Sequence, residues 1–380
     1  MVFNKIKYLC FIVLLLASCA GKQKNITNKD ITDTISFNHA KLLKIEKANN
    51  YYVATIHNPW CKGELHRYLL IKEENDIKTI KNKYQDAIPT SIIKIPLKKA
   101  VIGTAVHASI ISELEALNQV KGICDVQYIM SKEIKELILK EQIHNIGNSH
   151  QPDIEKMLSI ECDGLFISPY KKSNFNIIEK AGIPVIECAD YMELSALGRA
   201  EWIKFYGLLM GKQHRADSIF NIVEKNYIKL KGLAATQTFH PLLLNDLKMG
   251  NVWYMPGGKS TMSELFADAG ANYPFKNKGK SGSQNLSFEQ VFMKAHDADV
   301  WIIKYGKSID YTYDLLKQEF APYAEIKAFK QRCIYGCNTF KVPFFEQEPF
   351  HPDKMLNDLI KILYPDLLYD KPFYFFKPLK

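Results

Sequence analysis

The chain has 380 residues, of which 47% are hydrophobic and 24% are charged, a balance typical of a globular protein and not of a disordered one. Its formal net charge is +9, but the basic residues are spread thinly and form no run long enough for a nucleic-acid-binding patch. The length allows two compact lobes or one large domain, and we expect no nucleic-acid partner.

The first nineteen residues carry an export signal. Lys5 and Lys7 precede an apolar run, Tyr8–Leu16, that is too short to cross a bilayer of roughly 30 Å as a permanent helix. The run leads into Leu-Ala-Ser-Cys, which resembles the lipobox of bacterial lipoproteins, where the chain is cut before the cysteine and the cysteine is lipidated. We therefore expect residues 1–18 to be removed and Cys19 to anchor the chain to a membrane.

A polar segment and a group of strands come next. Residues 19–39 are polar and predict a flexible tether. Segments 41–47, 51–57 and 66–72 carry β-type runs, which predict a hairpin followed by a third strand. Trp60 lies in the loop between the last two segments. Because a tryptophan after Asn-Pro is not typical of a core, Trp60 is a candidate ligand contact.

Residues 40–190 then predict an N-terminal α/β lobe. Expected strands lie at 99–103, 122–125, 164–168 and 183–187, and expected helices at 107–117, 152–160 and 173–181, the second opened by Pro152. Short apolar strands that alternate with helices are typical of βαβ units and a largely parallel sheet.

The rest of the chain predicts a helical linker over 191–232 and a C-terminal α/β lobe over 233–380. Two helical stretches end at Gly211 and Gly232. Beyond them we expect strands at 240–244, 252–255 and 300–304 and helices at 260–269, 287–295 and 352–364. The predicted fold class is α/β, with two lobes of mainly parallel sheets flanked by helices and joined by a single long helix. Such a link is stiff, so large lobe closure is not expected.

Five segments follow one another along the chain: Val101–Thr104 (VIGT), His107–Leu117 (HASIISELEAL), Glu179–Val185 (EKAGIPV), Gly207–Lys212 (GLLMGK) and Ser263–Ala271 (SELFADAGA). Together, and in this order, they resemble the substrate-binding proteins of ABC importers, more narrowly the class that takes up iron-siderophores, haem or cobalamin. The strands over 40–72 precede the part that matches. Ser112 stands where the family has a glutamate, with Glu113 beside it.

The resemblance implies a large, flat, partly apolar ligand, which needs aromatic walls. In open α/β sheets ligands lie beyond the carboxyl ends of the strands, so the loops that leave those ends supply the candidates. The candidate ligand contacts are Trp60, His107, Ser109, Tyr128, Tyr170, Trp253, Tyr254, Tyr305 and Phe345. With 21 Phe and 20 Tyr in the chain, the alternative for each aromatic is a place in the core. The alternative for His107 is a solvated residue at the start of a helix.

The resemblance also implies partners. Each lobe of this class presents acidic residues to arginine pockets of a permease, which makes Glu113 and Glu264 candidate docking residues. Solvated helix carboxylates are the alternative. The expected function is a lipid-anchored, monomeric carrier in the periplasm that hands a ferric siderophore to an ABC permease, with cobalamin or haem as alternative ligands and no cofactor.

Two rival functions stay open. An exported α/β enzyme is one, although the sequence holds no nucleophile elbow, His-Glu-x-x-His motif or complete phosphate loop. Gly257–Ser260 lacks the first glycine of the phosphate-loop spacing and more simply starts a helix. The other rival is a scaffold whose ligand site has been lost, and a cleft filled by the protein's own side chains would favour it.

Overall fold

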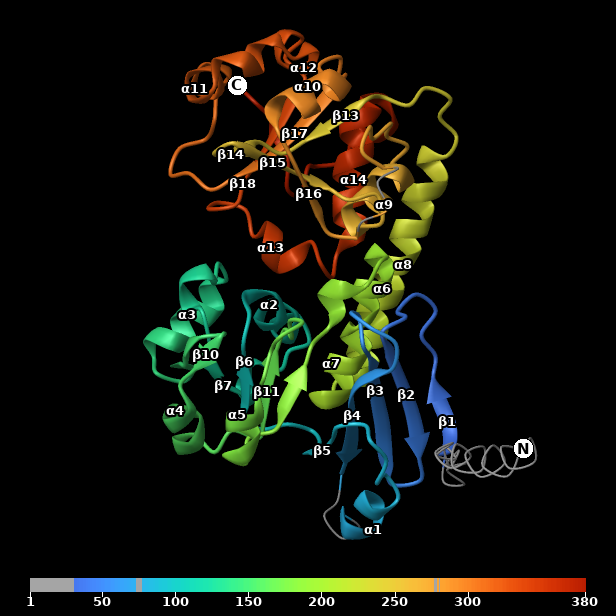
Figure 1. Cartoon of the computed structure of the whole chain (residues 1–380), viewed down its shortest axis with the longest axis vertical. Coiled ribbons are helices and arrows are strands. Elements are labelled where there is room, and N and C mark those ends of the chain that lie inside the picture. Colours follow the sequence, from blue (N-terminus) through green and yellow to red (C-terminus); the bar gives the residue numbers. More distant parts are fainter. Residues whose placement is uncertain (1–30, 73–76, 277–278, 280) are drawn as a thin grey trace, which may run out of the picture.

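The computed structural model describes residues 31–72, 77–276, 279 and 281–380, so the signal sequence and Cys19 lie outside the described residues. Two α/β lobes are stacked along the long axis of the molecule, and helices connect them along one side (Figure 1). A separate sheet, formed by the first five strands, lies beside the N-terminal lobe (Figure 1). The α/β fold class predicted from the sequence is confirmed.

The first sheet has the strand order β1-β2-β3-β4-β5 and is antiparallel except for the pair β4 and β5. Its elements are β1 (Ile31–Ile35), β2 (Leu43–Ala48), β3 (Tyr51–His57), β4 (Glu64–Ile71), α1 (Ile77–Asn82) and β5 (Thr90–Lys94). The hairpin and the third strand are confirmed. The tether predicted over 19–39 is wrong at its end, because β1 pairs with β2 and its two isoleucines pack against buried side chains.

The sheet of the N-terminal lobe is parallel throughout, in the order β12-β11-β6-β7-β8. Its strands are β6 (Ala100–Ile102), β7 (Val120–Ile123), β8 (His144–Asn145), β11 (Gly164–Ile167) and β12 (Val185–Glu187). Its helices are α2 (Ala105–Glu113), α3 (Lys132–Leu139), α4 (Ile154–Ser159) and α5 (Asn176–Lys180), and β9 (Gly147–Asn148) and β10 (Gln151–Pro152) form a small ladder. Pro152 therefore does not open α4, which begins after Asp153, whose side chain accepts the N–H of Lys156.

The connection between the lobes is helical, as predicted. It consists of α6 (Ala196–Glu201), α7 (Ile203–Leu209) and the long α8 (Gln213–Ala234). A turn at Gly211, which has a positive φ of 68°, separates α7 from α8 and folds them against each other. Helix α8 then runs up to the C-terminal lobe, where it packs on α14 (Figure 1).

The C-terminal lobe has two sheets. Strands β13 (Leu243–Asn245), β17 (Val300–Tyr305) and β18 (Ile334–Asn338) are parallel, and β19 (Lys377–Pro378) joins them antiparallel. Strands β14 (Lys248–Met249), β15 (Val252–Pro256) and β16 (Ser283–Leu286) form an antiparallel sheet. The helices are α9 (Thr261–Asp268), α10 (Phe288–Ala295), α11 (Tyr313–Glu319), α12 (Lys327–Lys330), α13 (Phe344–Gln347) and α14 (Pro352–Leu363).

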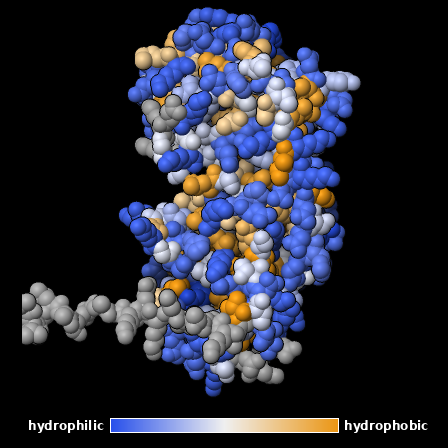
Figure 2. All heavy atoms as spheres, turned by 90° about the vertical axis from the view of Figure 1, so that its right-hand side faces the viewer, coloured by the Kyte–Doolittle hydropathy of each residue, from blue (hydrophilic) through white to orange (hydrophobic). Residues whose placement is uncertain are grey.

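One continuous cluster of buried apolar side chains extends through the first sheet, both lobes and the linker. The face shown in Figure 2 is mostly hydrophilic, and hydrophobic side chains are visible around the middle, where the lobes meet. Over the described part of the chain, no helix is both long and apolar enough to cross a membrane. A shared core of this kind is consistent with a stiff connection between the lobes.

Candidate ligand-binding cleft

A cavity of about 690 Å³ lies between the two lobes. The N-terminal lobe contributes the segment Gln127–Met130 after β7, Ala105 at the start of α2 and Lys135 of α3. The C-terminal lobe contributes Thr339 and Phe340, which follow β18, together with side chains around α13. The cavity is therefore built by loops that leave the carboxyl ends of parallel strands, the place where open α/β sheets bind ligands.

Three exposed aromatic side chains line this cavity. Tyr128 is 68% exposed and comes from the N-terminal lobe, whereas Phe340 and Phe345, 69% and 60% exposed, come from the C-terminal lobe. Large aromatic groups left this exposed at a concave surface are typical of a binding site, because they offer wide contact at a low entropic cost. Tyr128 and Phe345 were predicted from the sequence, and Phe340 was not.

A carboxylate at the floor of the cavity links the lobes. Glu346 of α13 accepts the backbone N–H of Met130 at 2.6 Å. Burial raises the pKa of Glu346, although that N–H and the charge of Lys135 favour its ionised form. The ammonium group of Lys135 also lines the cavity, so an anionic group on a ligand has a cationic partner there.

A second cavity of about 420 Å³ adjoins the first and shares Met130, Pro343 and Glu346 with it. Ser109 and Glu113 of α2 line it on one side, and His351 on the other. Ser109, a predicted ligand contact, therefore faces the space between the lobes but not the aromatic cavity. Helix α13 occupies part of the space between the lobes, and the two cavities lie beside it.

His107 does not reach either cavity, which corrects its assignment as a ligand contact. The side chain is only 2% exposed, since α2 turns it inward. Its Nδ1 lies 2.8 Å from the hydroxyl of Thr104 and its Nε2 lies 3.0 Å from a carboxylate oxygen of Asp190. Both ring nitrogens thus have partners within the protein, and the histidine has a structural role.

Trp253 and Tyr305 are also core residues, and their assignment as ligand contacts is corrected in the same way. Trp253 is fully buried and donates its indole N–H to the carbonyl of Asn245 at 3.0 Å. Tyr305 is buried and its hydroxyl accepts the N–H of Tyr311. Trp253 lies on the buried face of β15, where buried and more exposed residues alternate. Tyr305 ends β17, a strand that is buried on both faces except at Lys304.

The remaining predicted contacts lie outside the lining of both cavities. Tyr170 follows β11 and its ring meets that of His150 edge-on at a centroid distance of 5.9 Å. Tyr254 is exposed on β15. Trp60 is half-buried in the loop between β3 and β4, where the side chain of Asn58 accepts its backbone N–H. Their contact with a ligand stays a prediction.

The two predicted docking carboxylates both have partners inside the molecule. Glu113 is hydrogen-bonded to His351 Nε2 at 2.7 Å. Glu264 accepts the N–H of Ala196, the first residue of α6, at 2.8 Å. Burial raises the pKa of Glu264, with the nearby Asp268 adding to the effect. Neither residue is a freely solvated helix carboxylate, and docking stays a prediction for both.

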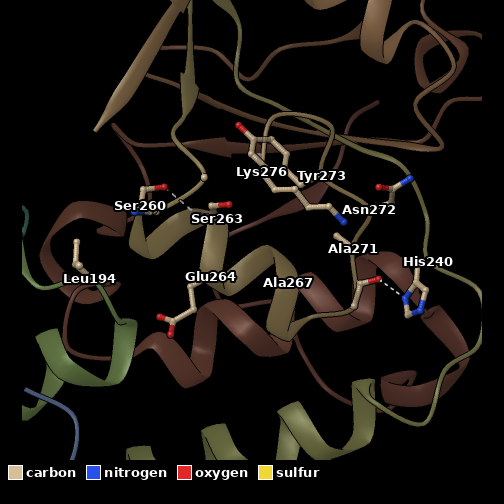
Figure 3. A pocket seen from close by; sticks show the side chains of 13 residues that line it. Leu194, His240, Ser260, Ser263, Glu264, Ala267, Ala271, Asn272, Tyr273 and Lys276 are labelled. Carbon is tan, nitrogen blue, oxygen red and sulfur yellow. Dashed lines mark hydrogen bonds between the residues drawn. The ribbon is translucent and has the colours of Figure 1, made fainter. Parts of the chain in front are cut away.

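Glu264 also lines a third cavity, of about 780 Å³, along α9 (Figure 3). At the start of α9 the side chain of Ser260 accepts the N–H of Ser263. Beyond the end of α9 the Nδ1 atom of His240 lies 2.9 Å from the carbonyl oxygen of Gly270. Lys259 and Lys276 contribute cations to its lining. This cavity is formed by the C-terminal lobe and Leu194 of the linker, and it shares no residue with the cleft.

The chain offers little for direct metal ligation within the described ranges. No group of three or more His, Cys, Asp or Glu side chains is placed there to hold a metal ion. The six cysteines of that part, from Cys61 to Cys337, are free thiols. Cys337 belongs to strand β18, and Cys333 directly precedes that strand.

This chain is similar to known proteins both in sequence and in fold. A family model of periplasmic binding proteins matches residues 101–339, more than half of the chain. An uncharacterised lipoprotein of Methanocaldococcus jannaschii is 24% identical, over 97% of this chain and 94% of its own length.

Solved structures share the fold. The TroA-like periplasmic binding protein FepB from Veillonella parvula has a TM-score of 0.58 at 17% identity and covers 75% of this chain and 95% of its own. IsdE of S. aureus, solved in complex with haem, has a TM-score of 0.53 at 17% identity and covers 70% of this chain and 98% of its own. The two-lobed α/β fold of this chain is therefore shared with these binding proteins.

Proposed function

Because this chain belongs to the periplasmic binding protein family, we propose that it is a non-catalytic carrier that captures a metal chelate between its lobes and delivers it to an ABC permease. A ferric siderophore is the first candidate ligand, and cobalamin or haem are the alternatives. IsdE, which has the same fold, binds haem. One observation carries the proposal: exposed aromatic side chains from both lobes face one cavity of about 690 Å³.

The size and the lining of that cavity support an organic ligand. Sites for small organic molecules typically measure about 300–1,000 Å³ and are mainly apolar with a few polar groups. Here Tyr128, Phe340 and Phe345 supply the apolar area, and Lys135 and Glu346 the polar groups. Contributions from both lobes are what a carrier needs, because a ligand held by both also stabilises one relative position of the lobes.

Calorimetric titration of the full-length, detergent-solubilised chain tests the proposal. The panel is a ferric tris-catecholate chelate, a ferric hydroxamate chelate, haemin and cyanocobalamin. We expect one member to bind once per chain with a Kd of about 1 μM or lower, near 8 kcal/mol of binding free energy. Calorimetry suits this chain because no tryptophan lines the cleft cavities in the described part of the chain.

Variants then locate the site. Tyr128→Ala and Phe345→Ala should each weaken binding by about tenfold, the loss expected for an aromatic contact of about 1.4 kcal/mol. Phe239→Ala is the matched control, since Phe239 is 65% exposed and lies outside the cleft. Failure of all four compounds to bind, or turnover of any of them, would contradict the proposal.

We also propose that Cys19 carries the lipid and anchors the body to a membrane outside the cytoplasm, in a periplasm where the cell has one. The Methanocaldococcus jannaschii relative is described as a lipoprotein, and the Leu-Ala-Ser-Cys motif supports the same assignment. Metabolic labelling with a radioactive fatty acid should mark the wild-type chain and not Cys19→Ser. Equal labelling of both would exclude Cys19 as the lipidated residue.

Permease docking through Glu264 and Glu113 belongs to the same proposal. Glu264 is the better candidate, because Ser112, and not Glu113, stands where the family has a glutamate. Glu264→Gln should lower ligand uptake by cells and leave the calorimetric affinity unchanged. A fall in affinity would instead assign Glu264 to ligand binding.

A further inference from the structure

The turn that follows β18 presents Phe340 to the cleft. Its ring is 69% exposed and lines the aromatic cavity, yet the turn that carries it is built from well-ordered hydrogen bonds. The N–H of Thr339 donates to the carbonyl of Tyr305 at 2.7 Å, and the N–H groups of Lys341 and Val342 both donate to the carbonyl of Asn338 at 2.9 Å. An exposed aromatic on a fixed backbone is unusual for a surface loop and indicates a binding platform.

Asn338 fixes this turn from below. Its side chain is 1% exposed and its amide nitrogen donates to the carbonyl of Lys307 at 2.8 Å and to the carboxylate of Asp310 at 2.9 Å. Its amide oxygen accepts the N–H groups of Phe340 and Lys307 at 3.2 and 3.3 Å. One buried amide thereby connects the turn after β18 with the turn after β17, and all its hydrogen-bonding groups are used.

Gly306 packs directly against the ring of Phe340. A Cβ atom at position 306 would lie 2.6 Å from Cε1 and 2.9 Å from Cδ1 of that ring, and its nearest neighbours all belong to Phe340. The backbone of Gly306 is not in the left-handed region, so its conformation does not demand glycine. The absence of a side chain at position 306 lets the ring rest directly on the main chain, and a Cβ atom there would push the ring away.

We propose that Gly306 and Asn338 are positioning residues that hold Phe340 as a preformed aromatic wall of the cleft, and that this wall selects molecules with a flat apolar face. The inference rests on the proposed function only in taking the cleft as the binding site. A wall that is already fixed costs little entropy when a ligand binds, so its contact area converts more fully into affinity.

Gly306→Ala and Phe340→Ala test the proposal, each alone and together, in the full-length chain. The probe is 8-anilinonaphthalene-1-sulfonate, a flat, apolar, anionic dye, titrated by fluorescence with Phe239→Ala as the control. We expect Phe340→Ala and Gly306→Ala each to weaken dye binding by about five- to tenfold, within the range of one aromatic contact. Phe340→Tyr should keep the wild-type affinity, and Phe340→Leu should lose it.

The double variant separates positioning from a general loss of structure. If Gly306 acts only through Phe340, the double variant binds the dye no more weakly than Phe340→Ala alone. Losses that multiply would overturn the positioning role, and an unchanged affinity of Phe340→Ala would overturn the wall itself. Asn338→Ala should weaken dye binding in the same way as Gly306→Ala.

A crystal structure of Gly306→Ala provides a measurement that needs no ligand. The ring of Phe340 should be displaced while the rest of the lobe is unchanged, and an undisplaced ring would overturn the proposal. The dye and the crystal structure are independent of the chelate panel. Failure of every chelate to bind would therefore reject the proposed function without deciding the role of Phe340.

Discussion

The carboxylate of Glu113 and the Nε2 atom of His351 meet at 2.7 Å between the two lobes. Glu113 is the last residue of α2, and His351 directly precedes α14, so the contact joins the N-terminal lobe to the C-terminal lobe. The Glu346 carboxylate adds a second link through the N–H of Met130. Two carboxylate contacts thus join the lobes beside the cleft cavities.

Removing the first of these links should loosen the cleft. Burial acts to raise the pKa of Glu113, but the hydrogen bond and charge of His351, with Lys354 and Arg215, outweigh it and hold that pKa below its ordinary value. A depressed carboxylate pKa stabilises the fold above the ordinary glutamate pKa, and this gain is lost as the pH falls through the lowered value. Because about a third of the side chain stays exposed, the gain is at most about 1 kcal/mol.

We therefore expect Glu113→Gln to lower the free energy of unfolding by up to about 1 kcal/mol at neutral pH, measured by urea titration. The radius of gyration from X-ray scattering should rise slightly. The difference from wild type should disappear in acid, below the lowered pKa. Glu136→Gln, an exposed glutamate of α3, serves as the control. A deficit that persists in acid would show that the glutamine disturbs packing instead.

Asp190 holds a buried charge network beside the linker. Its Oδ1 accepts from the hydroxyl of Tyr206 at 2.9 Å and is paired with His107, and its Oδ2 lies 3.2 Å from Nε of Arg199. Burial by itself would raise the pKa of Asp190, but the charge and hydrogen bond of His107, with Arg199 and Tyr206, keep it below the ordinary value. Its stabilising effect is present at neutral pH and is lost as the pH falls through the lowered pKa.

Asp190→Asn should destabilise the protein by about 3–5 kcal/mol, the cost of leaving partners of a buried ion pair uncompensated. The measurement is the urea midpoint, with Asp217→Asn, an exposed residue of α8, as the control. His107→Ala should also lower stability, whereas affinity for any compound that binds the cleft should stay within about twofold once folding is complete. A selective loss of affinity in His107→Ala would restore its role as a ligand contact.

The sequence predicted those parts of the fold and the site that follow from the order of strands and helices along the chain. Apolar strands alternating with helices identified β6, β11, β12 and β17, and the rule that ligands lie beyond strand ends found Tyr128. Composition could not separate exposed from buried aromatics, which is why Trp253 and Tyr305 were assigned to the ligand. Both lie on strands where burial depends on which face the neighbouring helices cover, and that is a property of tertiary packing.

Phe340 was missed for a local reason. Strand β18 reads Ile-Tyr-Gly-Cys-Asn, with a glycine in its middle and without alternation, so its strand character is weak in the sequence. Without that strand the turn after it has no predicted place at the cleft. Strand β18 is placed by its parallel pairing with β17, which is buried along its length except at Lys304. Gly306, which lies two residues beyond the strand predicted over 300–304, was the available signal for a close approach.

Two linker carboxylates attach the first sheet to the rest of the molecule. The carboxylate of Glu201 accepts the N–H groups of Asn38, His39 and Ala40 at 2.8 to 3.0 Å, and Glu193 accepts those of Lys41 and Leu42. The segment 38–42, which leads into β2, is therefore attached by its backbone to the linker region. This attachment is invisible in the sequence, because it joins residues about 160 positions apart.

Glu201→Ala should release the segment before β2. Burial acts to raise the pKa of Glu201, but Lys204 and the three N–H groups outweigh it, so the carboxylate stabilises the fold at neutral pH and loses this effect as the pH falls through its lowered pKa. We expect faster cleavage near residues 36–42 in limited proteolysis and a stability loss of about 2–4 kcal/mol for three unsatisfied donors. Glu224→Ala is the control. Glu224 is partly exposed and pairs with the side chain of His39, so its loss should have a smaller effect on cleavage and stability. Equal cleavage of Glu201→Ala and wild type would exclude this attachment.

Two glycines of the linker should respond to alanine in opposite directions. A Cβ at Gly207 of α7 would lie 2.4 Å from the Cβ of Ala216 of α8, and neither atom can move without its helix. Gly207→Ala should therefore separate the two helices and cost about 1–3 kcal/mol. Gly232, near the end of α8, has open space around it, and Gly232→Ala should stabilise by about 0.5–1 kcal/mol because alanine is the better helix former. Thermal unfolding of both variants measures the contrast, and a destabilised Gly232→Ala together with a neutral Gly207→Ala would show that the close α7–α8 crossing is not what holds the linker together.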